Sequence, residues 1–469
     1  MTHQIQHLTE DQLAIVALST PQGSGAIAVI RFSGQNVFDV VNKIARISSG
    51  KNVIDLPTHT IHHGFIIDDE KSSTVVDEVL FFLMRAPKTF TGQDIIEISS
   101  HNNPFIIEKI IQVACKNGAR QARHGEFCKR AFLAGKINLI QAEAINELIN
   151  AQNEVALEKS MAQISGTLSS FLMKLEHDFV ELLGFVEASF EFLTEEQSDI
   201  NLNQIIKTKS SYISERVIEL KTNFNHQQQI RDGIKIVLLG SVNVGKSTLF
   251  NALLGKDRAI VSEVEGTTRD SIESNIYKDG AFWTFIDTAG LRQTSDFVEQ
   301  EGIQRSILEA EKADIVLLVV DLSQKMHDEL WKSYQKILDK HAKKIIVVLN
   351  KIDKAANEYF TYFQHDVIVR VSAEQRIGIE DLKCVVQQKV KNMIENRSAN
   401  FLLNQRQARL INEISIKLDS IVNEYLNSVE YELMAYKIKE ILELMSELNG
   451  RDVGERVLDS VFNSFCIGK

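Results

Sequence analysis

A glycine-rich segment near the middle of the chain has the residue types and the spacing that bind nucleotide phosphates. The sequence Gly-Ser-Val-Asn-Val-Gly-Lys-Ser begins at Gly240, directly after an apolar run and directly before a helix-like stretch. Glycines let backbone amides wrap around phosphates, and the start of a helix adds positive potential. Lys246 is expected to reach the β- and γ-phosphates, and Ser247 to ligate Mg²⁺. We predict that the following residues contact the nucleotide: Asn243, Val244, Gly245, Lys246, Ser247 and Thr248.

Three later motifs favour guanine over adenine as the base. They follow strand-like apolar runs, and their predicted contact residues are Asp287, Thr288, Ala289 and Gly290, then Asn350, Lys351 and Asp353, then Ser372 and Ala373. Asp287 suits a water-mediated contact with Mg²⁺, and Gly290 suits a sensor of the γ-phosphate. The Asp353 carboxylate can accept hydrogen bonds from guanine N1–H and the 2-amino group, two donors that adenine lacks. Four motifs in this order, each at the end of a strand, predict a GTP-binding site.

The loop after the phosphate-binding helix resembles a nucleotide switch. We predict that it contacts GTP through Ser262, Glu263, Val264, Glu265, Gly266, Thr267 and Thr268. Thr268 is the expected second Mg²⁺ ligand, because a threonine here can close onto the metal when the γ-phosphate is present. Leu291 stands where Ras-like enzymes carry a water-orienting glutamine, and leucine cannot polarise water. A monovalent cation held by Asn243 and loop carbonyls would supply positive charge instead. The alternative is that Asn243 only braces the loop.

Charged residues in the first third of the chain leave two questions open. Arg31 and Glu97 each interrupt an apolar strand-like run, so each is either an edge residue, which we favour, or a ligand. The basic segment 120–136 suits either a phosphate or polyacid ligand or a plain solvated face.

The chain ends Phe-Cys-Ile-Gly-Lys, with Cys466 fourth from the end, but the last two residues fit a prenylation box poorly. We therefore favour a tail that docks into a site over a merely packed end.

The bulk composition is that of an ordinary multidomain protein. The 469 residues predict two or three domains, and the net charge of −11 argues against broad non-specific binding of nucleic acid. The four cysteines form no CxxC pair, so neither a disulfide framework nor a zinc site is expected, and a reducing cytoplasm is the predicted compartment. No apolar run is long enough to span a membrane, and the polar N-terminus is unlike a secretory signal.

The elements that must position these motifs follow from the pattern of apolar residues. A mixed α/β region is predicted for 1–134, with strands in AIAVIRFSG, EVLFFLM and DIIEISS. Helical periodicity begins near Ile137, covers 135–232, and returns over 394–469. Between the helical parts, 233–393 alternates short β-branched strands with helices, as in a parallel α/β sheet. The expected strands are IKIVLLG, DIVLLVVD, KKIIVVLN and VIVRVS, with a hairpin formed by SIESNIY and AFWTFID. The simplest architecture inserts this α/β unit into one helical domain.

Motifs spread over almost the whole chain resemble those of the MnmE (TrmE) family of tRNA-modification GTPases. They are GAIAVIRFSG, FTGQDIIEISSH, HGEFCKRAFLAGKINLIQAEAI, NVGKSTLFNALLG, GTTRD, DTAGLR, NKID and the terminal FCIGK. Two departures are visible. Asn102 and Asn103 replace a usual glycine pair after His101, and the P-loop reads SVNVG where RPNAG is common.

The resemblance implies a fold, ligands and partners. It implies an N-terminal tetrahydrofolate-binding domain that forms the homodimer, a helical domain, and an inserted Ras-like P-loop GTPase domain. Folate contacts would fall on Arg31, Glu97, Lys136 and Lys469, with 5-formyl- or 5,10-methylene-tetrahydrofolate as the one-carbon carrier. K⁺ would be held by Asn243, Ser262, Val264 and Thr267, and Mg²⁺ by Ser247 and Thr268. Glu299 would position water, and the other candidate catalytic residues are Arg269 and Cys466.

The implied activity joins GTP hydrolysis to tRNA chemistry. With a partner that uses FAD and NADH, MnmG (GidA), family members form a heterotetramer that adds a carboxymethylaminomethyl or aminomethyl group to C5 of a wobble uridine. The competing reading is a GTPase switch that assists ribosome assembly and performs no modification. The folate-like segment and FCIGK favour the first reading.

Overall fold

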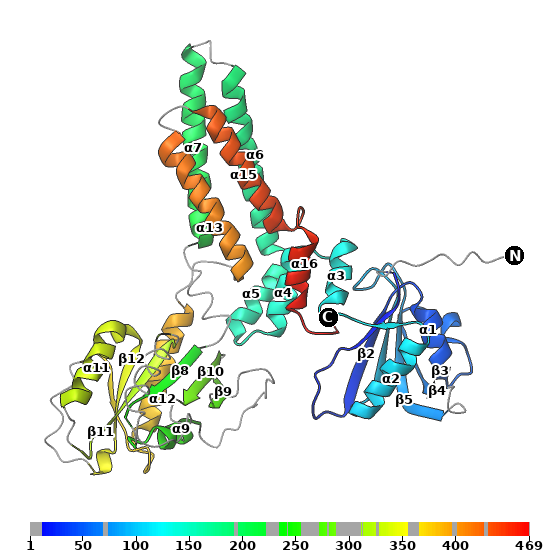
Figure 1. Cartoon of the computed structure of the whole chain (residues 1–469), viewed down its shortest axis with the longest axis horizontal. Coiled ribbons are helices and arrows are strands. Elements are labelled where there is room, and N and C mark those ends of the chain that lie inside the picture. The colour runs from blue at the N-terminus through cyan, green and yellow to red at the C-terminus, as the bar shows by residue number, and fades with distance from the viewer. Residues whose placement is uncertain are drawn as a thin grey trace. The chain divides into compact units, whose positions relative to one another are not determined.

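The computed structural model contains two compact units (Figure 1). One unit comprises residues 1–146, 163–214 and 413–469, and the other comprises 147–162 and 215–412. The structure describes residues 12–68, 74–191, 196–221, 234–241, 243–254, 272–278, 281–287, 311, 313–324, 328–354, 365–395, 401–425 and 430–468.

The N-terminal part of the first unit is a sheet with two helices packed on one face and a third helix against part of the other. Its elements are β1 (Ile15–Leu18), β2 (Ile27–Ser33), α1 (Val37–Ile44), β3 (Ala45–Ile47), β4 (Thr60–Asp68), β5 (Thr74–Met84), β6 (Ile95–His101), α2 (Pro104–Lys116), β7 (Arg120–Gln121) and α3 (Glu126–Leu133). The strand order is β3-β4-β5-β6-β2-β1-β7, antiparallel except for the parallel β1–β7 pair.

Alternation along the strands decides which face of this sheet is covered. Ala28, Ile30 and Phe32 of β2 pack into a buried core with α1 and α2. Their neighbours Val29 and Arg31 point to the other face, since successive strand residues alternate. That face carries exposed apolar side chains, at Ile27, Ile61 and Leu80. On this second face, Phe127 of α3 packs with Ile15 and Ala17 of β1, and the part beyond them is open and borders on Arg31.

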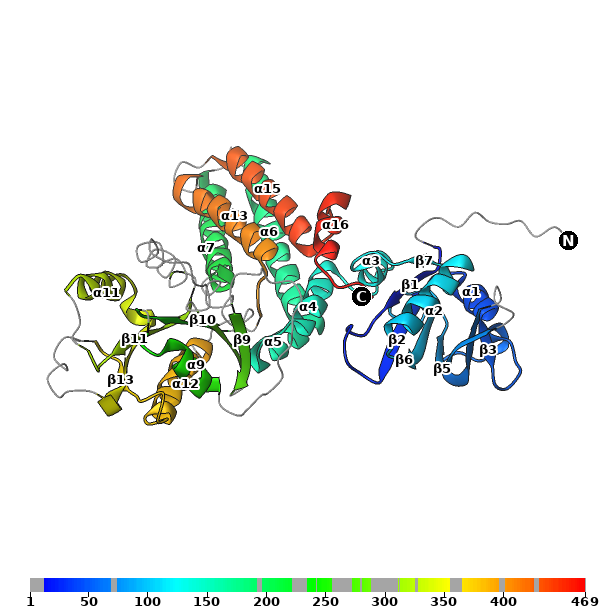
Figure 2. The ribbon, with the colours of Figure 1, turned by 60° about the horizontal axis from the view of Figure 1, so that its bottom comes forward.

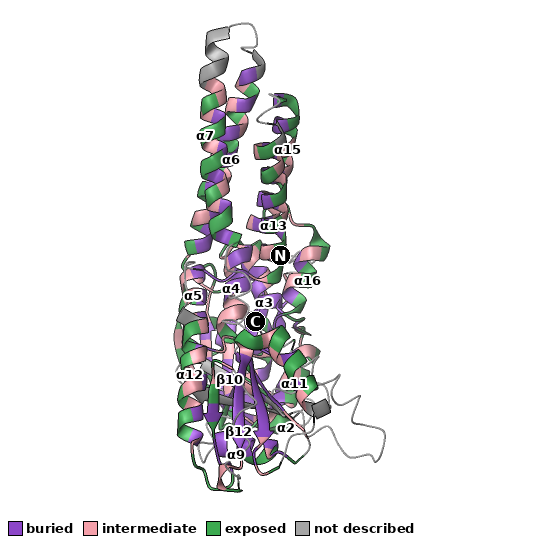
Figure 3. Cartoon of the chain, turned by 90° about the vertical axis from the view of Figure 1, so that its left-hand side faces the viewer, coloured by how far each residue is buried: buried purple, intermediate pink, exposed green. Residues whose placement is uncertain are grey.

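The rest of the first unit is helical. Its helices, some of which extend into the second unit, are α4 (Leu139–Ile149), α5 (Glu154–Ile164), α6 (Thr167–Glu191), α7 (Glu196–Lys221), α13 (Gln405–Ser420), α15 (Tyr431–Asn449) and α16 (Glu455–Asn463). The long helices α6 and α15 lie side by side although more than two hundred residues separate them (Figures 1 and 3). Asn449 donates to Glu176 at 2.9 Å across this pair, and Arg451 forms an ion pair with the same carboxylate. The two helical stretches of the sequence thus pack together.

The second unit contains a six-stranded sheet between two layers of helices (Figure 2). Its elements are β8 (Ile234–Leu239), α9 (Lys246–Leu254), β9 (Ile272–Lys278), β10 (Ala281–Asp287), β11 (Ile315–Asp321), α11 (Asp328–His341), β12 (Ile345–Asn350), β13 (Ile368–Arg370) and α12 (Ile379–Glu395). The order is β13-β12-β11-β8-β10-β9, parallel except for β9. Ile236 and Leu238 face α9 and α12, whereas Val237 and Leu239 face α11.

The predicted fold class is confirmed: a mixed α/β N-terminal part, a helical part and a parallel α/β nucleotide-binding unit. The β9–β10 pair is the hairpin expected from SIESNIY and AFWTFID. Among the helices that the structure describes, none is both long and apolar enough to cross a bilayer.

Candidate functional site

The nucleotide motifs converge at one edge of the second unit's sheet. Strands β8, β10, β12 and β13 all run in the same direction, so their carboxyl ends lie at the same edge. The P-loop follows β8, Asp287 is the last residue of β10, Asn350 ends β12, and Ser372 follows β13. The sheet thereby brings together motifs that are up to 132 residues apart in sequence, from Gly240 to Ser372.

Two glycines shape the P-loop. Gly240 has φ +154° and Gly245 has φ +93°, backbone conformations that favour glycine. A Cβ on Gly240 would lie 2.4 Å from the Val319 carbonyl oxygen, and one on Gly245 would lie 2.5 Å from Nδ2 of Asn350. The loop therefore needs glycine at both positions, for conformation and for space.

Lys246 is held inside the P-loop. Its ammonium donates to the carbonyl oxygens of Gly240 at 2.9 Å and Ser241 at 2.8 Å, and the residue is 8% exposed. Ser241 in turn donates its backbone N–H to the Tyr334 hydroxyl of α11 at 2.9 Å. Val244 is buried, whereas Ser247 and Thr248 are exposed at the start of α9. This places a fixed cation at the N-terminus of a helix, where an anion is favoured.

Asn350 and Lys351 join the base-reading loops to the P-loop. The buried Asn350 side chain donates to the Val244 carbonyl oxygen at 2.8 Å and accepts from the backbone N–H of Ala373 at 3.0 Å. Lys351 donates to the Asn243 carbonyl oxygen at 2.8 Å. Three of the predicted motifs are thus connected directly by hydrogen bonds.

Asp353 has a free acceptor where the guanine edge is expected. A hydrogen bond from the Ser372 side chain is the main cause that lowers the pKa of Asp353, so the group is a carboxylate at neutral pH. Its Oδ1 atom is buried and has no hydrogen-bond partner among the described residues. A buried acceptor without a donor is unfavourable unless a ligand supplies one. This arrangement fits the N1–H and 2-amino donors of guanine.

Several predicted contacts cannot be placed. The candidates that lie outside the described residues are Ser262, Glu263, Val264, Glu265, Gly266, Thr267, Thr268, Arg269, Thr288, Ala289, Gly290, Glu299 and Lys469. For Asp287 the structure describes only the strand to which it belongs. The described part of the site is therefore the P-loop and the base-reading loops.

We predict that Asp353→Asn weakens GTP binding about 10- to 100-fold, since a hydrogen bond to a charged group contributes roughly 1.5–3 kcal/mol. The amide NH2 would face guanine's 2-amino donor without an acceptor, whereas the 2-oxo group of xanthine would accept a hydrogen bond from it. Equilibrium titration with fluorescent GDP and XDP analogues measures both changes. The control is Asp366→Asn, which removes an exposed carboxylate of the same unit. Unchanged GDP affinity in Asp353→Asn would remove the base-reading role.

Arg31 and Glu97 form a second polar site, on the open face of the N-terminal sheet. They are direct cross-strand partners on β2 and β6, and Arg31 Nε donates to Glu97 Oε1 at 2.7 Å. Both strands have neighbours on each side in the sheet. The favoured interpretation of these charges as edge residues is therefore wrong. Their side chains remain 26% and 24% exposed, so the pair is open to a ligand.

The end of the chain docks beside this pair. The carbonyl oxygen of Gly468 accepts from Arg31 Nη1 at 3.3 Å and from the Ser19 hydroxyl at 3.2 Å. Gly468 has φ +93°, and a Cβ there would lie 2.2 Å from the Leu18 carbonyl oxygen. Earlier in the tail, the Phe465 carbonyl oxygen lies 3.0 Å from His124 Nδ1. The docked tail matches the interpretation that we favoured.

Cys466 lies between these anchoring points of the tail. Its backbone carbonyl oxygen accepts from the Gly125 N–H at 3.4 Å, and the residue is exposed. Phe465 on one side is buried, as is Gly468 beyond. The backbone of the tail is therefore held while the thiol stays accessible.

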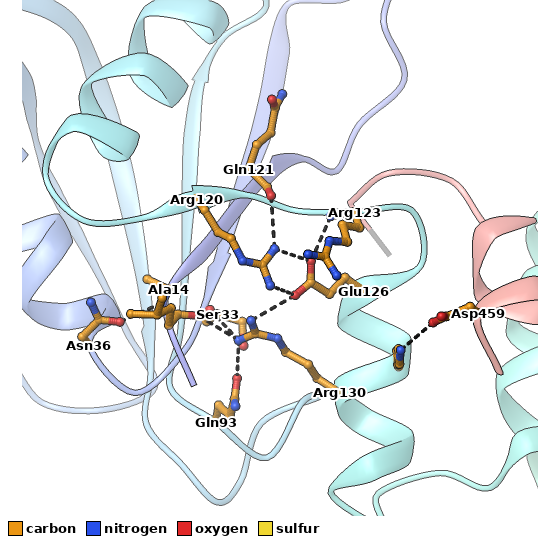
Figure 4. A network of polar contacts seen from close by, with 12 residues as sticks. Ala14, Ser33, Asn36, Gln93, Arg120, Gln121, Arg123, Glu126, Arg130 and Asp459 are labelled. Carbon is orange, nitrogen blue, oxygen red and sulfur yellow. Dashed lines mark hydrogen bonds and ion pairs between the residues drawn. The ribbon is translucent and has the colours of Figure 1, made fainter. Parts of the chain in front are cut away.

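The basic segment 120–136 is not a plain solvated face. Arg120 and Arg130 both bind the carboxylate of Glu126, at 2.5 Å and 3.0 Å (Figure 4). Burial alone would raise the pKa of Glu126, but hydrogen bonds and charge from Arg120, Arg123 and Arg130 lower it. Removing one partner from such a buried ion pair lowers the free energy of unfolding by roughly 3–5 kcal/mol. Arg120 and Arg130 thus organise the fold instead of facing solvent.

The remaining cations and the two asparagines have local roles. Lys136 donates to the Pro87 carbonyl oxygen at 2.7 Å and is exposed. Asn103 caps α2 by accepting from the Phe105 N–H at 2.9 Å, and Asn102 donates to the Gly23 carbonyl oxygen at 2.8 Å. The two asparagines that replace the usual glycine pair thus stabilise the turn after β6 through side-chain hydrogen bonds.

Sequence reasoning missed three residues that support these sites. The Tyr334 hydroxyl accepts a hydrogen bond from the P-loop residue Ser241, Asp321 accepts one from Lys351 at 2.7 Å, and the Ser19 hydroxyl donates one to the tail. Asp321 had a readable signal, because it ends an apolar strand of the same sheet as the other motifs. No sequence feature pointed to Tyr334 or Ser19, since neither belongs to a motif.

Comparison with known proteins finds related sequences along almost the whole chain. A family model described as GTP-binding protein TrmE N-terminus matches residues 14–136, and one described as MnmE helical domain matches residues 139–466. The chain is 36% identical over 456 residues to the tRNA modification GTPase MnmE of Aquifex aeolicus (strain VF5), covering 97% of this chain and 99% of that protein. It is 33% identical over 460 residues to the protein of that name from Bacillus subtilis (strain 168), covering 97% and 99%. The chain belongs to the MnmE family of tRNA modification GTPases.

Proposed function

We propose that this protein hydrolyses GTP and uses a folate-borne carbon unit in the modification of tRNA wobble uridine. The observation that carries the proposal is the terminal segment docked at the Arg31–Glu97 pair. A GTPase switch that only assists ribosome assembly has no use for a second polar site completed by the chain's own end. The relatives that match it along almost their full length are named as tRNA modification GTPases, which supports the same reading.

The nucleotide site would hold GTP through groups already in place. Lys246 and the P-loop amides would meet the phosphates, and Asp353 the guanine. Mg²⁺ would take Ser247 and Thr268 as ligands, and K⁺ would take Asn243, Ser262, Val264 and Thr267. When bound, these cations supply positive charge to the phosphate oxygens. Glu299 would orient the attacking water, and Arg269 would brace the switch loop.

The N-terminal site would hold a tetrahydrofolate derivative. Glu97 keeps a carboxylate oxygen available beyond the one that Arg31 binds, and a carboxylate suits the amino-pyrimidine edge of a pterin. Lys136 and Lys469 are candidate partners for the glutamate tail. The exposed thiol of Cys466 would stand beside this site.

The partners follow from the open surfaces and from the family. The uncovered sheet face, with its exposed Ile27, Ile61 and Leu80, supports a homodimer formed by the N-terminal domain. MnmG (GidA), which would carry FAD and NADH, is the proposed partner in a heterotetramer that acts on tRNA. The proposed compartment is the cytoplasm.

The test is the wobble position of tRNA in cells that lack this protein. Nucleoside mass spectrometry should show the C5-substituted uridine replaced by its unmodified precursor. A plasmid copy of the chain should restore the modification, and a copy with Lys246→Ala should not. Normal wobble uridine in the deleted strain, together with a ribosome-subunit defect, would favour the assembly-factor alternative.

A further inference from the structure

Asp321 is a carboxylate at the nucleotide edge of the sheet that none of the nucleotide motifs contains. It ends β11, the strand between β8 and β12, and therefore lies between the P-loop and the base-reading loop. Its carboxylate accepts from the backbone N–H of Ser323 at 2.8 Å and from the Ser323 hydroxyl at 2.6 Å, both through Oδ1. Its other oxygen, Oδ2, accepts from the Lys351 ammonium at 2.7 Å.

The carboxylate is ionised and fixed in orientation. Its side chain is 13% exposed, and that of Lys351 is 29% exposed, so water screens the pair only in part. Although burial raises the pKa of Asp321, hydrogen bonds from Lys351 and Ser323 lower it below its ordinary value. The turn at Ser323 thus aims one carboxylate oxygen at Lys351.

The backbone is strained both at Lys351 and at Asn243, the residue whose carbonyl oxygen the Lys351 side chain binds. The Lys351 backbone has φ +64°, and that of Asn243 has φ +62°. Both are left-handed conformations that cost non-glycine residues free energy unless neighbours hold them. A long lysine side chain is otherwise free to rotate away from the site. The ion pair with Asp321 keeps the ammonium on the P-loop carbonyl.

We propose that Asp321 is a positioning residue for guanine-nucleotide binding, which acts through Lys351 on the P-loop turn at Asn243. It touches no nucleotide itself. Without Asp321, the Lys351 side chain would have to become ordered when the nucleotide binds. The P-loop turn at Asn243 would then lose the hydrogen bond that holds it in the free protein. The inference rests on the proposed GTP binding and adds a residue to that site.

The test compares nucleotide affinity in single and double variants of the full chain. Asp321→Asn should weaken binding of a fluorescent GDP analogue about tenfold, as expected when an ion pair is replaced by a hydrogen bond from the Lys351 ammonium to a neutral amide. Lys351→Met should weaken it as much or more. The double variant should bind no worse than Lys351→Met alone, because Asp321 acts only through that side chain. Ser323→Ala, which removes one of the two bonds that aim the carboxylate, should give a smaller loss of about threefold.

The control is Asp339→Asn, which removes an exposed carboxylate on α11 and should leave GDP affinity unchanged. The nucleotide-free unfolding temperature should be equal in Asp321→Asn and the control. The inference is overturned if Asp321→Asn binds GDP like the unmutated chain, or if the losses from Asp321→Asn and Lys351→Met multiply in the double variant. Failure of the unmutated chain to bind GDP would instead overturn the proposed function, and with it this inference.

Discussion

GTP hydrolysis by this protein is expected to be roughly 10²-fold faster in potassium than in sodium at equal ionic strength, a part of the roughly 10³–10⁵ that an arginine finger contributes. Leu291 cannot orient water as a glutamine does, and the P-loop contains no arginine. Another positive charge must therefore offset the charge that develops between the β- and γ-phosphates. Potassium held by Asn243 and carbonyls of the switch loop is the proposed source. Phosphate release at saturating GTP, measured in each salt, checks this.

The Asn243 side chain can be removed without opposing its backbone. Because Asn243 has φ +62°, alanine would add strain, whereas glycine adopts this conformation readily. Asn243→Gly should lose the potassium stimulation and keep most GDP affinity, since Lys246 and the P-loop amides remain. Potassium should also promote pairing of two nucleotide domains with GDP–aluminium fluoride, as judged by light scattering. Equal turnover of the unmutated protein in both salts would end this mechanism.

Deletion of residues 465–469 is expected to abolish tRNA modification and leave GTP affinity unchanged. The deleted segment supplies the Gly468 carbonyl that accepts from Arg31 and Ser19, and it carries the exposed thiol. It belongs to the first unit, whereas the P-loop belongs to the second. Wobble-uridine analysis, reduced-folate titration and GDP titration of the same preparation separate these roles.

A milder variant tests the docking itself. Gly468→Ala would place a Cβ 2.2 Å from the Leu18 carbonyl oxygen, so the tail should leave its place and modification should fall at least tenfold. Asn463→Ala, an exposed change at the end of α16, is the control. If truncation destroys GDP affinity while folate affinity persists, the tail has been assigned to the wrong site.

Local sequence was enough to identify the nucleotide site. The P-loop, NKID and Ser372-Ala373 are short motifs whose chemistry depends on residues within one turn. Each follows an apolar strand, and parallel strands bring their carboxyl ends to one edge. The apolar run of β8 fits a strand that is covered on both faces of the sheet, and Ile236 and Val237 pack into separate cores on those two faces.

Other features depended on which distant segments meet. From the sequence alone, Arg31 and Glu97 were interpreted as charges on edge strands. The register of the sheet instead places these two residues, 66 positions apart in sequence, opposite each other on two inner strands. From sequence, the cations of 120–136 suited either an anionic ligand or a solvated face, whereas the structure buries Arg130 against Glu126.

The amino-acid sequence by itself therefore determined the fold class, the family and the nucleotide chemistry, because short-range periodicity and motif spacing encode them. Only the tertiary structure decided the partners of Asp321 and the place of the tail. Gly468 meets Arg31 across 437 residues. Nothing local distinguishes that carbonyl from any other, and its role arises only when the helical part brings the chain's end back to β2.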